Sequence, residues 1–180
     1  MRVLVPAVVV SALFVTACES GPTDIQPLTP DATAFARSAP THSVTGGGTV
    51  VYDTDPGYEV GSRESYGISA RQRPDGSVEG MIEMHWPAPY DLKAHGTVTC
   101  LNVEGNQAWI GFAISRTDQP DAFPVGSQWV FFVTDNGAGK NSAPDQVSYF
   151  FRVADAALCS TLSGPINTQF DWTNGNLTVR

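Results

Sequence analysis

Ser-Val-Glu-Gly-Met-Ile-Glu-Met-His-Trp, residues 77–86, is the stretch that decides the fold. Apolar residues and glycine recur at every second position from Val78 to Trp86, and mostly polar residues stand between them. Successive side chains of a β-strand point to opposite faces, so this alternation predicts a strand with one face in a core and the other in water.

Other stretches rich in β-branched and aromatic residues lie on both sides of this strand, separated by turn-forming residues. They are residues 48–53, 65–73, 96–104, 107–116, 127–134, 146–154 and 175–180, with a short additional stretch at 166–172. Tight turns such as Asp75-Gly76 and Gly105-Asn106 join antiparallel neighbours. We therefore expect an all-β domain of about eight or nine antiparallel strands, and both a sandwich and a closed barrel fit this pattern.

The N-terminus has the pattern of an export signal. Arg2 is followed by the apolar run Val3–Val15, which is shorter than the roughly 20 residues of a membrane-spanning helix. The run ends in Val-Thr-Ala-Cys, residues 15–18, which resembles the lipobox of bacterial lipoproteins. That resemblance implies cleavage after Ala17 and a diacylglyceryl group on Cys18. The alternative is an ordinary secretory signal in which Cys18 has no role.

Three regions follow from this pattern. Residues 1–17 are the signal peptide, residues 18–46 are the lipidated cysteine and a flexible tether, and residues 47–180 are the all-β domain. The tether is assigned because residues 19–46 are rich in Pro, Thr, Ser and Ala and have no hydrophobic period.

Charge limits the partners of the chain. The formal net charge is −8, and removal of the signal, whose only charged residue is Arg2, leaves −9. Because basic residues form no cluster, we expect no nucleic-acid partner. The lipid on Cys18 is then the contact with the membrane. Glu19 follows the cysteine where an aspartate would signal retention in the inner membrane of enteric bacteria, so an envelope location in the outer membrane is favoured.

Two cysteines remain once Cys18 is lipidated. An even pair in an exported protein favours a disulfide between Cys100 and Cys159. The alternative is two buried free thiols, which pack well as small hydrophobic side chains.

Several segments resemble an uncharacterised family of bacterial secreted β domains, found after choice-of-anchor modules or as free lipoproteins. The matching segments are residues 67–71, 75–80, 95–101, 105–111, 135–137, 144–145 and 175–179. The shared positions are mainly glycines and turns, so the resemblance implies a fold and no catalytic or binding residues.

The sequence argues against enzyme chemistry. Gly67-Ile68-Ser69 has only the first half of a nucleophile elbow and lies within a strand. Glu79 and Glu83 share a strand face but are separated by roughly 13 Å, which exceeds the spacing of a glycosidase pair. No histidine or cysteine motif with zinc-ligand spacing is present.

Two weaker candidate sites remain. Asp135, Asn136 and Asp145 offer oxygen ligands in a glycine-rich loop that could bind calcium, although Lys140 opposes a cation and Asp-Asn-Gly is also ordinary turn chemistry. Trp86 and Tyr90 flank a proline-rich loop and are the best candidates for exposed rings that bind a glycan or peptide, the alternative being core packing.

The expected function is that of a lipid-anchored, non-enzymatic envelope module that binds a ligand or a partner of unknown identity. The alternative is a structural spacer or adhesion lipoprotein without a small-molecule ligand, and an enzyme is the third possibility. An internal cavity would favour the first and a filled core the second.

Overall fold

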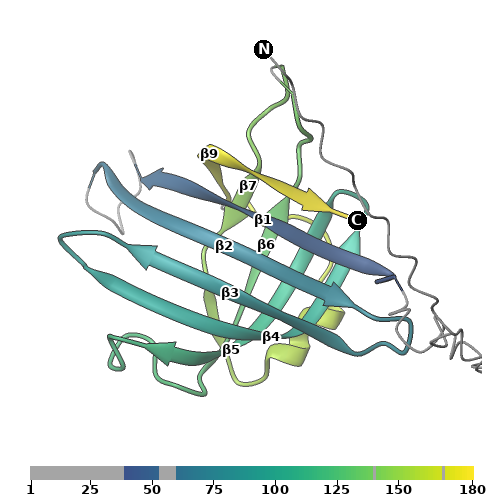
Figure 1. The fold of residues 1–180 in the computed structure, drawn as a ribbon, viewed down its shortest axis with the longest axis horizontal. Coiled ribbons are helices and arrows are strands. Elements are labelled where there is room, and N and C mark those ends of the chain that lie inside the picture. The colour runs from purple at the N-terminus through teal and green to yellow at the C-terminus, as the bar shows by residue number, and fades with distance from the viewer. Residues whose placement is uncertain (1–38, 53–59, 140, 168) are drawn as a thin grey trace, which may run out of the picture. The chain divides into compact units, whose positions relative to one another are not determined.

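The computed structural model describes residues 39–52, 60–139, 141–167 and 169–180. The described residues form nine β-strands and one short 3-10 helix (Figure 1). In chain order these are β1 His42–Tyr52, β2 Ser62–Gln72, β3 Val78–Trp86, β4 Leu92–Glu104, β5 Gln107–Thr117, β6 Gln128–Thr134, β7 Gln146–Ser148, β8 Phe151–Val153, η2 Ala156–Thr161 and β9 Gln169–Val179.

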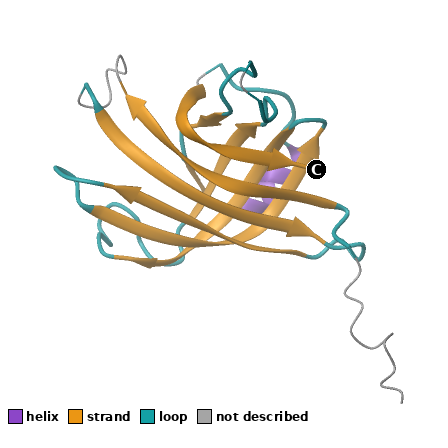
Figure 2. Cartoon of the chain, turned by 45° about the horizontal axis from the view of Figure 1, so that its top comes forward, coloured by secondary structure: helices purple, strands orange, loops and turns teal. Residues whose placement is uncertain are grey.

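The strands close into a barrel. They are hydrogen-bonded in the order β5-β4-β3-β2-β1-β9-β7-β6-β8, and β5 pairs in addition with β6. That last pairing joins eight antiparallel strands into a closed barrel (Figure 2). β8 is an extra strand that pairs with β6. The all-β, antiparallel prediction is confirmed, and of the two architectures that the sequence left open the structure has the barrel.

The barrel has two distinct ends, which we name after the first and last residues of β1. At the His42 end, β1 begins and β9 finishes, and Ser43 and Arg180 exchange two backbone hydrogen bonds of 2.8 and 2.9 Å. At the Tyr52 end lie the connections 87–91, between β3 and β4, and 118–127, between β5 and β6. The chain therefore enters and leaves the barrel at the same end.

Large apolar side chains fill the centre of the barrel. The inward face of β3 is the predicted one, since Ile82, Met84 and Trp86 are buried. Phe131 contacts Phe112 and Phe150 with ring centroids 5.7 and 4.9 Å apart. Packing of this kind stabilises a domain through the apolar area that it removes from water.

A second, smaller apolar layer lies outside the barrel and explains why β5 and β6 are apolar on both faces. Trp109, Val130 and Phe132 point outward and are covered by the segment that contains η2. The predicted disulfide is present there: Cys100 on β4 is bonded to Cys159 in η2, with Cα atoms 6.1 Å apart. The bridge therefore holds the covering segment to the barrel wall.

Glycines within strands account for the main errors in the predicted boundaries. β1 begins at His42, inside the predicted tether, and β9 runs unbroken through Gly175, joining two predicted stretches. A Cβ at Gly46 (φ +152°) would meet the carbonyl oxygen of Asn176, and a Cβ at Gly48 would meet the indole of Trp172. These glycines allow close approach between elements, so they are strand residues and not a linker. The predicted strand 146–154 is divided into β7 and β8.

Within the residues described, no helix is long and apolar enough to cross a membrane. Cys18 and most of the predicted tether lie outside the described residues.

Candidate functional site

A polar cluster lies inside the barrel near its Tyr52 end. Strand alternation points Glu64 and Tyr66 of β2 and Tyr52 of β1 inward, and all three are buried. The Tyr52 hydroxyl donates to Glu64 Oε2 at 2.5 Å and lies 3.1 Å from the Tyr66 hydroxyl. The Tyr66 hydroxyl also interacts with Glu64, so the two phenols and the carboxyl form one cluster.

The carboxyl of Glu64 is protonated at neutral pH. Burial raises the pKa of Glu64 from 4.5 to about 8, and the hydrogen-bonding groups of Tyr52, Tyr66 and Trp86 lower it only in part. Burial, followed by the nearby Glu64, also raises the pKa of Tyr66 well above its usual value. The cluster is therefore uncharged at neutral pH, which suits its position in an apolar core.

Three buried polar atoms have no hydrogen-bond partner within the described part of the chain: Ser62 Oγ, Glu64 Oε1 and Trp172 Nε1. All three belong to residues that pair with the same short stretch of β1, since Ser62 is opposite Tyr52, and both Glu64 and Trp172 are opposite Val50. Unpartnered buried groups are uncommon in proteins because each costs about 1–3 kcal/mol. Their concentration in one place marks this end of the barrel as the candidate site.

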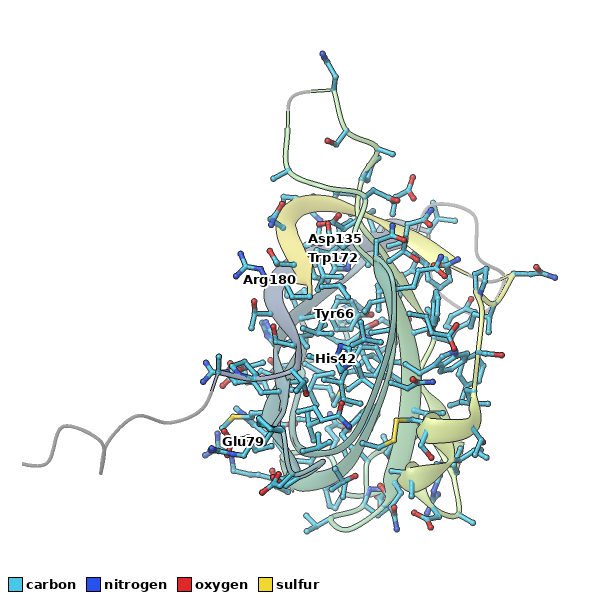
Figure 3. The ribbon with its side chains drawn as sticks, turned by 90° about the vertical axis from the view of Figure 1, so that its right-hand side faces the viewer. His42, Tyr66, Glu79, Asp135, Trp172 and Arg180 are labelled. Carbon is cyan, nitrogen blue, oxygen red and sulfur yellow. A yellow bond between two sulfur atoms is a disulfide. The ribbon has the colours of Figure 1, made fainter. Side chains whose placement is uncertain are left out.

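Trp172 reaches this site because β1 carries a glycine beside it. Its indole lies against Gly48, where any larger residue would collide with the ring, and Gly48 is paired on its other side with Tyr66. Figure 3 shows Tyr66 and Trp172 among the side chains that fill the space between the barrel walls. The two rings thus come from strands on opposite sides of β1 and face the same interior.

Partly buried aromatic rings surround the cluster. Phe170 packs edge-on against Tyr52 and Tyr149 with centroid distances of 4.9 and 4.6 Å. Phe150 contacts Tyr66 at 5.4 Å. Because the side chain of Glu64 is only 1% exposed, a molecule from solvent reaches it only if some of these rings move.

The outer wall of the barrel carries solvent-open hollows of a different character. One of about 340 Å³ lies over Gly67 and is lined by polar side chains including Glu83, His85 and Lys93, and an adjoining one of about 520 Å³ includes Met81. Glu83 Oε1 lies 3.6 Å from Nδ1 of His95, whose Nε2 lies 2.7 Å from the Arg116 guanidinium. These hollows are open to solvent, and Glu83 and His95 already contact each other there, so they are weaker candidates than the interior cluster.

The two aromatic residues predicted to be exposed lie in different environments. Trp86 is only 6% exposed and stacks on Phe123 inside the Tyr52 end, with centroids 5.3 Å apart. The expectation of an exposed Trp86 is therefore wrong, because Trp86 is the last inward position of β3 and the connection 118–127 covers it. Tyr90 is 38% exposed, in agreement with its predicted place in a loop.

The two aspartates of the predicted calcium loop bind backbone N–H groups of β9. Asp145 Oδ2 accepts from Leu177 at 2.6 Å, and Asp135 Oδ2 accepts from Val179 at 2.9 Å. β7 pairs with β9 only as far as Asp171, so the two carboxylates stand where the carbonyls of a longer neighbouring strand would be. Asn136 belongs to the same arrangement, since its N–H donates to Asp145 Oδ1 at 2.8 Å.

This arrangement gives a prediction that distinguishes a structural role of Asp145 from a role in binding calcium. Asp145→Asn should lower the free energy of unfolding by about 2–3 kcal/mol. The substitution removes the negative charge and replaces one of the two carboxylate oxygens, which accept from the N–H groups of Leu177 and Asn136, with an NH₂ group that cannot accept. Urea denaturation measures the change, once with calcium and once with chelator. Asp171→Asn, at an exposed position on β9, is the control. A loss confined to the calcium-loaded protein would contradict the structural role and support a metal site.

Within the described ranges, no group of three or more His, Cys, Asp or Glu side chains is placed to hold a metal ion. Calcium at Asp135, Asn136 and Asp145 stays a prediction.

Sequence reasoning did not find Glu64, because the strand was expected to begin at Ser65. A signal was available: Glu64 is in phase with Tyr66, Ile68 and Ala70, all of which point inward. A strand begun three residues earlier would have placed a carboxyl on the core face. Comparisons with protein families, with curated proteins and with solved structures found no match.

Proposed function

We propose that this chain is a lipid-anchored, non-enzymatic module of the bacterial cell envelope whose barrel binds a small ligand at its Tyr52 end. The observation that carries the proposal is the set of three buried, unpartnered polar atoms on Ser62, Glu64 and Trp172. A ligand that supplies their missing partners would recover the free energy that their burial costs.

Eight-stranded barrels of this size either fill their interior with side chains or hold one small ligand. In this barrel the centre is filled, whereas the Tyr52 end combines a few polar groups with many rings, which is the usual composition of a small-molecule site. Binding is favoured over catalysis because the groups that act on Glu64 belong to Tyr52, Tyr66 and Trp86, whereas a catalytic pair would join it to a second carboxylate, a histidine or a cysteine.

The envelope location comes from the N-terminal sequence. Cys18, with the apolar run before it, supplies the anchor, and the outer membrane is favoured by Glu19. The partners are then the membrane, through the lipid, and the ligand.

The binding function is tested by Trp172→Phe, which removes the unpartnered N–H and retains an aromatic ring. A panel of small water-soluble molecules is screened for an increase in the melting temperature, since a ligand that binds only the folded state stabilises it. Compounds that stabilise the parent protein are expected to stabilise Trp172→Phe less. Compounds that act equally on both proteins bind elsewhere, and a panel without any stabilising compound would contradict the proposal.

A structural spacer or adhesion lipoprotein is the second candidate, favoured by the filled centre of the barrel. In that case ordered water molecules satisfy the three polar atoms, and Trp172→Phe alters stability without altering the response to any compound.

The anchor gives a separate prediction. Cys18→Ser should leave the precursor uncleaved or release the protein into the soluble fraction, because the hydroxyl cannot take the lipid. Membrane fractionation and intact mass of the protein from its native host measure the outcome, and Cys100→Ala with Cys159→Ala is the control for loss of cysteine elsewhere. A Cys18→Ser protein that remains with the membranes at its mature mass would contradict lipidation.

A further inference from the structure

We propose that the ligand at the Tyr52 end is a small organic ammonium ion that also carries an oxygen acceptor, held between the Glu64 carboxylate and the Trp172 indole N–H. The proposal rests on the binding function proposed above and adds the chemical class of the ligand. It follows from three features of the site: a carboxyl without a countercharge, a surrounding of aromatic rings, and an indole donor without an acceptor.

The first feature is the missing countercharge. Among the buried residues that the structure describes there is no lysine, arginine or histidine, so no cation of the chain pairs with Glu64 in the interior. The two titratable groups that face Glu64 are Tyr52 of β1 and Tyr66 of β2, while β3 contributes Trp86, which does not ionise. A cationic ligand would supply the countercharge that makes the ionised carboxylate favourable in this environment.

The free oxygen of Glu64 sets the geometry of that contact. When the carboxyl loses its proton to form the carboxylate, Oε2 still accepts from Tyr52, so the oxygen available to the ligand is Oε1. A primary or secondary ammonium donates an N–H to such an oxygen, and a charge-assisted bond of this kind is about twice as strong as a neutral one.

The second feature is the aromatic surrounding. Tyr52, Tyr66 and Trp86 lie around the carboxyl, and Phe170 and Phe150 pack on the two phenols. Ring faces attract ammonium ions and do not attract carboxylates, and their effect is largest in a desolvated site. An apolar ligand would gain from the rings but would leave Glu64 Oε1 unpartnered, and an anionic ligand would find no lysine, arginine or histidine among the buried residues that the structure describes.

The third feature is Trp172. Its Nε1–H is buried without an acceptor, and Trp172 and Glu64 are the two register partners of Val50. An ammonium ligand that binds Glu64 as the carboxylate and also satisfies Trp172 therefore presents a donor at one end and an acceptor at the other. Because an indole nitrogen can only donate, a hydroxyl, ether or carbonyl oxygen is the complement.

Calorimetric titration with three probes of one skeleton tests the ligand class. Tyramine, tyrosol and 4-hydroxyphenylacetate share a phenol oxygen and differ in a cationic, neutral or anionic head. Tyramine is expected to bind about tenfold or more tightly than tyrosol, and 4-hydroxyphenylacetate is expected to bind weakest. In Glu64→Gln, which keeps the size of the side chain, tyramine should lose its advantage over tyrosol.

A second readout does not depend on relative affinity. Because the Glu64 carboxyl is protonated before a cation binds, tyramine binding near pH 7 should release about one proton, which titrations in buffers of different ionisation enthalpy measure. Tyramine binding to the Glu64→Gln variant should release no proton. The matched control is Glu83→Gln on the outer wall, which should behave as the parent protein does.

The outcomes separate the two proposals. Tyrosol or 4-hydroxyphenylacetate binding as tightly as tyramine, with loss in Trp172→Phe, would overturn the ammonium assignment and leave the binding function in place. Equal tyramine binding by the parent protein and Glu64→Gln would also overturn it. If none of the probes binds, the ammonium assignment is wrong, and the compound panel with Trp172→Phe decides the binding function independently.

Discussion

The free energy of unfolding is expected to fall by up to about 5 kcal/mol between about pH 5 and pH 9. The cause is Glu64, whose pKa is about 8 in the folded protein and 4.5 in an unperturbed chain. Because the folded pKa is the higher one, the folded state holds the proton more tightly. The resulting stability is complete below about pH 4.5 and is lost as the pH rises through 8.

Glu64→Gln is expected to remove most of this dependence, since an amide mimics the protonated carboxyl and cannot ionise. At about pH 9 the variant should be more stable than the parent protein, and near pH 5 the two should be similar. Urea denaturation at a series of pH values measures both proteins, and Glu83→Gln, at an exposed position, should keep the parent profile. A parent profile that is flat between these pH values would contradict the burial of an ionisable Glu64.

The second large effect is expected at the disulfide. Loss of the Cys100–Cys159 bridge should lower the free energy of unfolding by about 4 kcal/mol, because the bridge spans 59 residues and limits the entropy of the unfolded chain. Cys159 is fully buried, so reductant is applied during denaturant unfolding, where the bond becomes accessible. The Cys100→Ala, Cys159→Ala double variant removes the bridge without leaving a thiol.

Three measurements are compared in urea: the parent protein, the parent protein with reductant, and the double variant. The last two should share a midpoint well below that of the first, and reductant should not change the double variant. Hydrogen exchange should show the largest loss of protection in η2, because the bridge holds this segment over Trp109 and Phe132. A parent midpoint that is unaffected by reductant would contradict the predicted contribution.

The sequence predicts the features of this fold that depend on residues close together in the chain, and it does not predict those that depend on contacts between distant strands. The alternation in 77–86 correctly predicts β3 and its buried face because strand period is a local property. The pairing of β5 with β6 that closes the barrel is not local, so a sandwich fitted the same pattern. Residues 46–48 were assigned to the tether or to its boundary because glycine is typical of turns and linkers. In the structure Gly46 and Gly48 are strand residues, and atoms of β9 lie too close to them to leave room for a larger side chain.

The candidate site was harder to predict than the disulfide. Once Cys18 is set aside as the predicted lipidation site, only Cys100 and Cys159 remain, so these two could be paired without a structure. Glu64 is one of 18 acidic residues, and only the start of β2 at Ser62 shows that it points inward. Trp172 required the register of β9 against β1, which the bulge between Thr49 and Val50 shifts. No local pattern contains that information.

The end of the barrel at which β1 begins determines where the N-terminal segment is attached to the domain. Ser43 and Arg180 are joined at the His42 end, so the segment that leads back toward Cys18 departs from the end opposite the Glu64 cluster. If Cys18 carries the proposed lipid, a force from the membrane would act first on the residues that begin β1, and the loops at the Tyr52 end would not be the point of attachment.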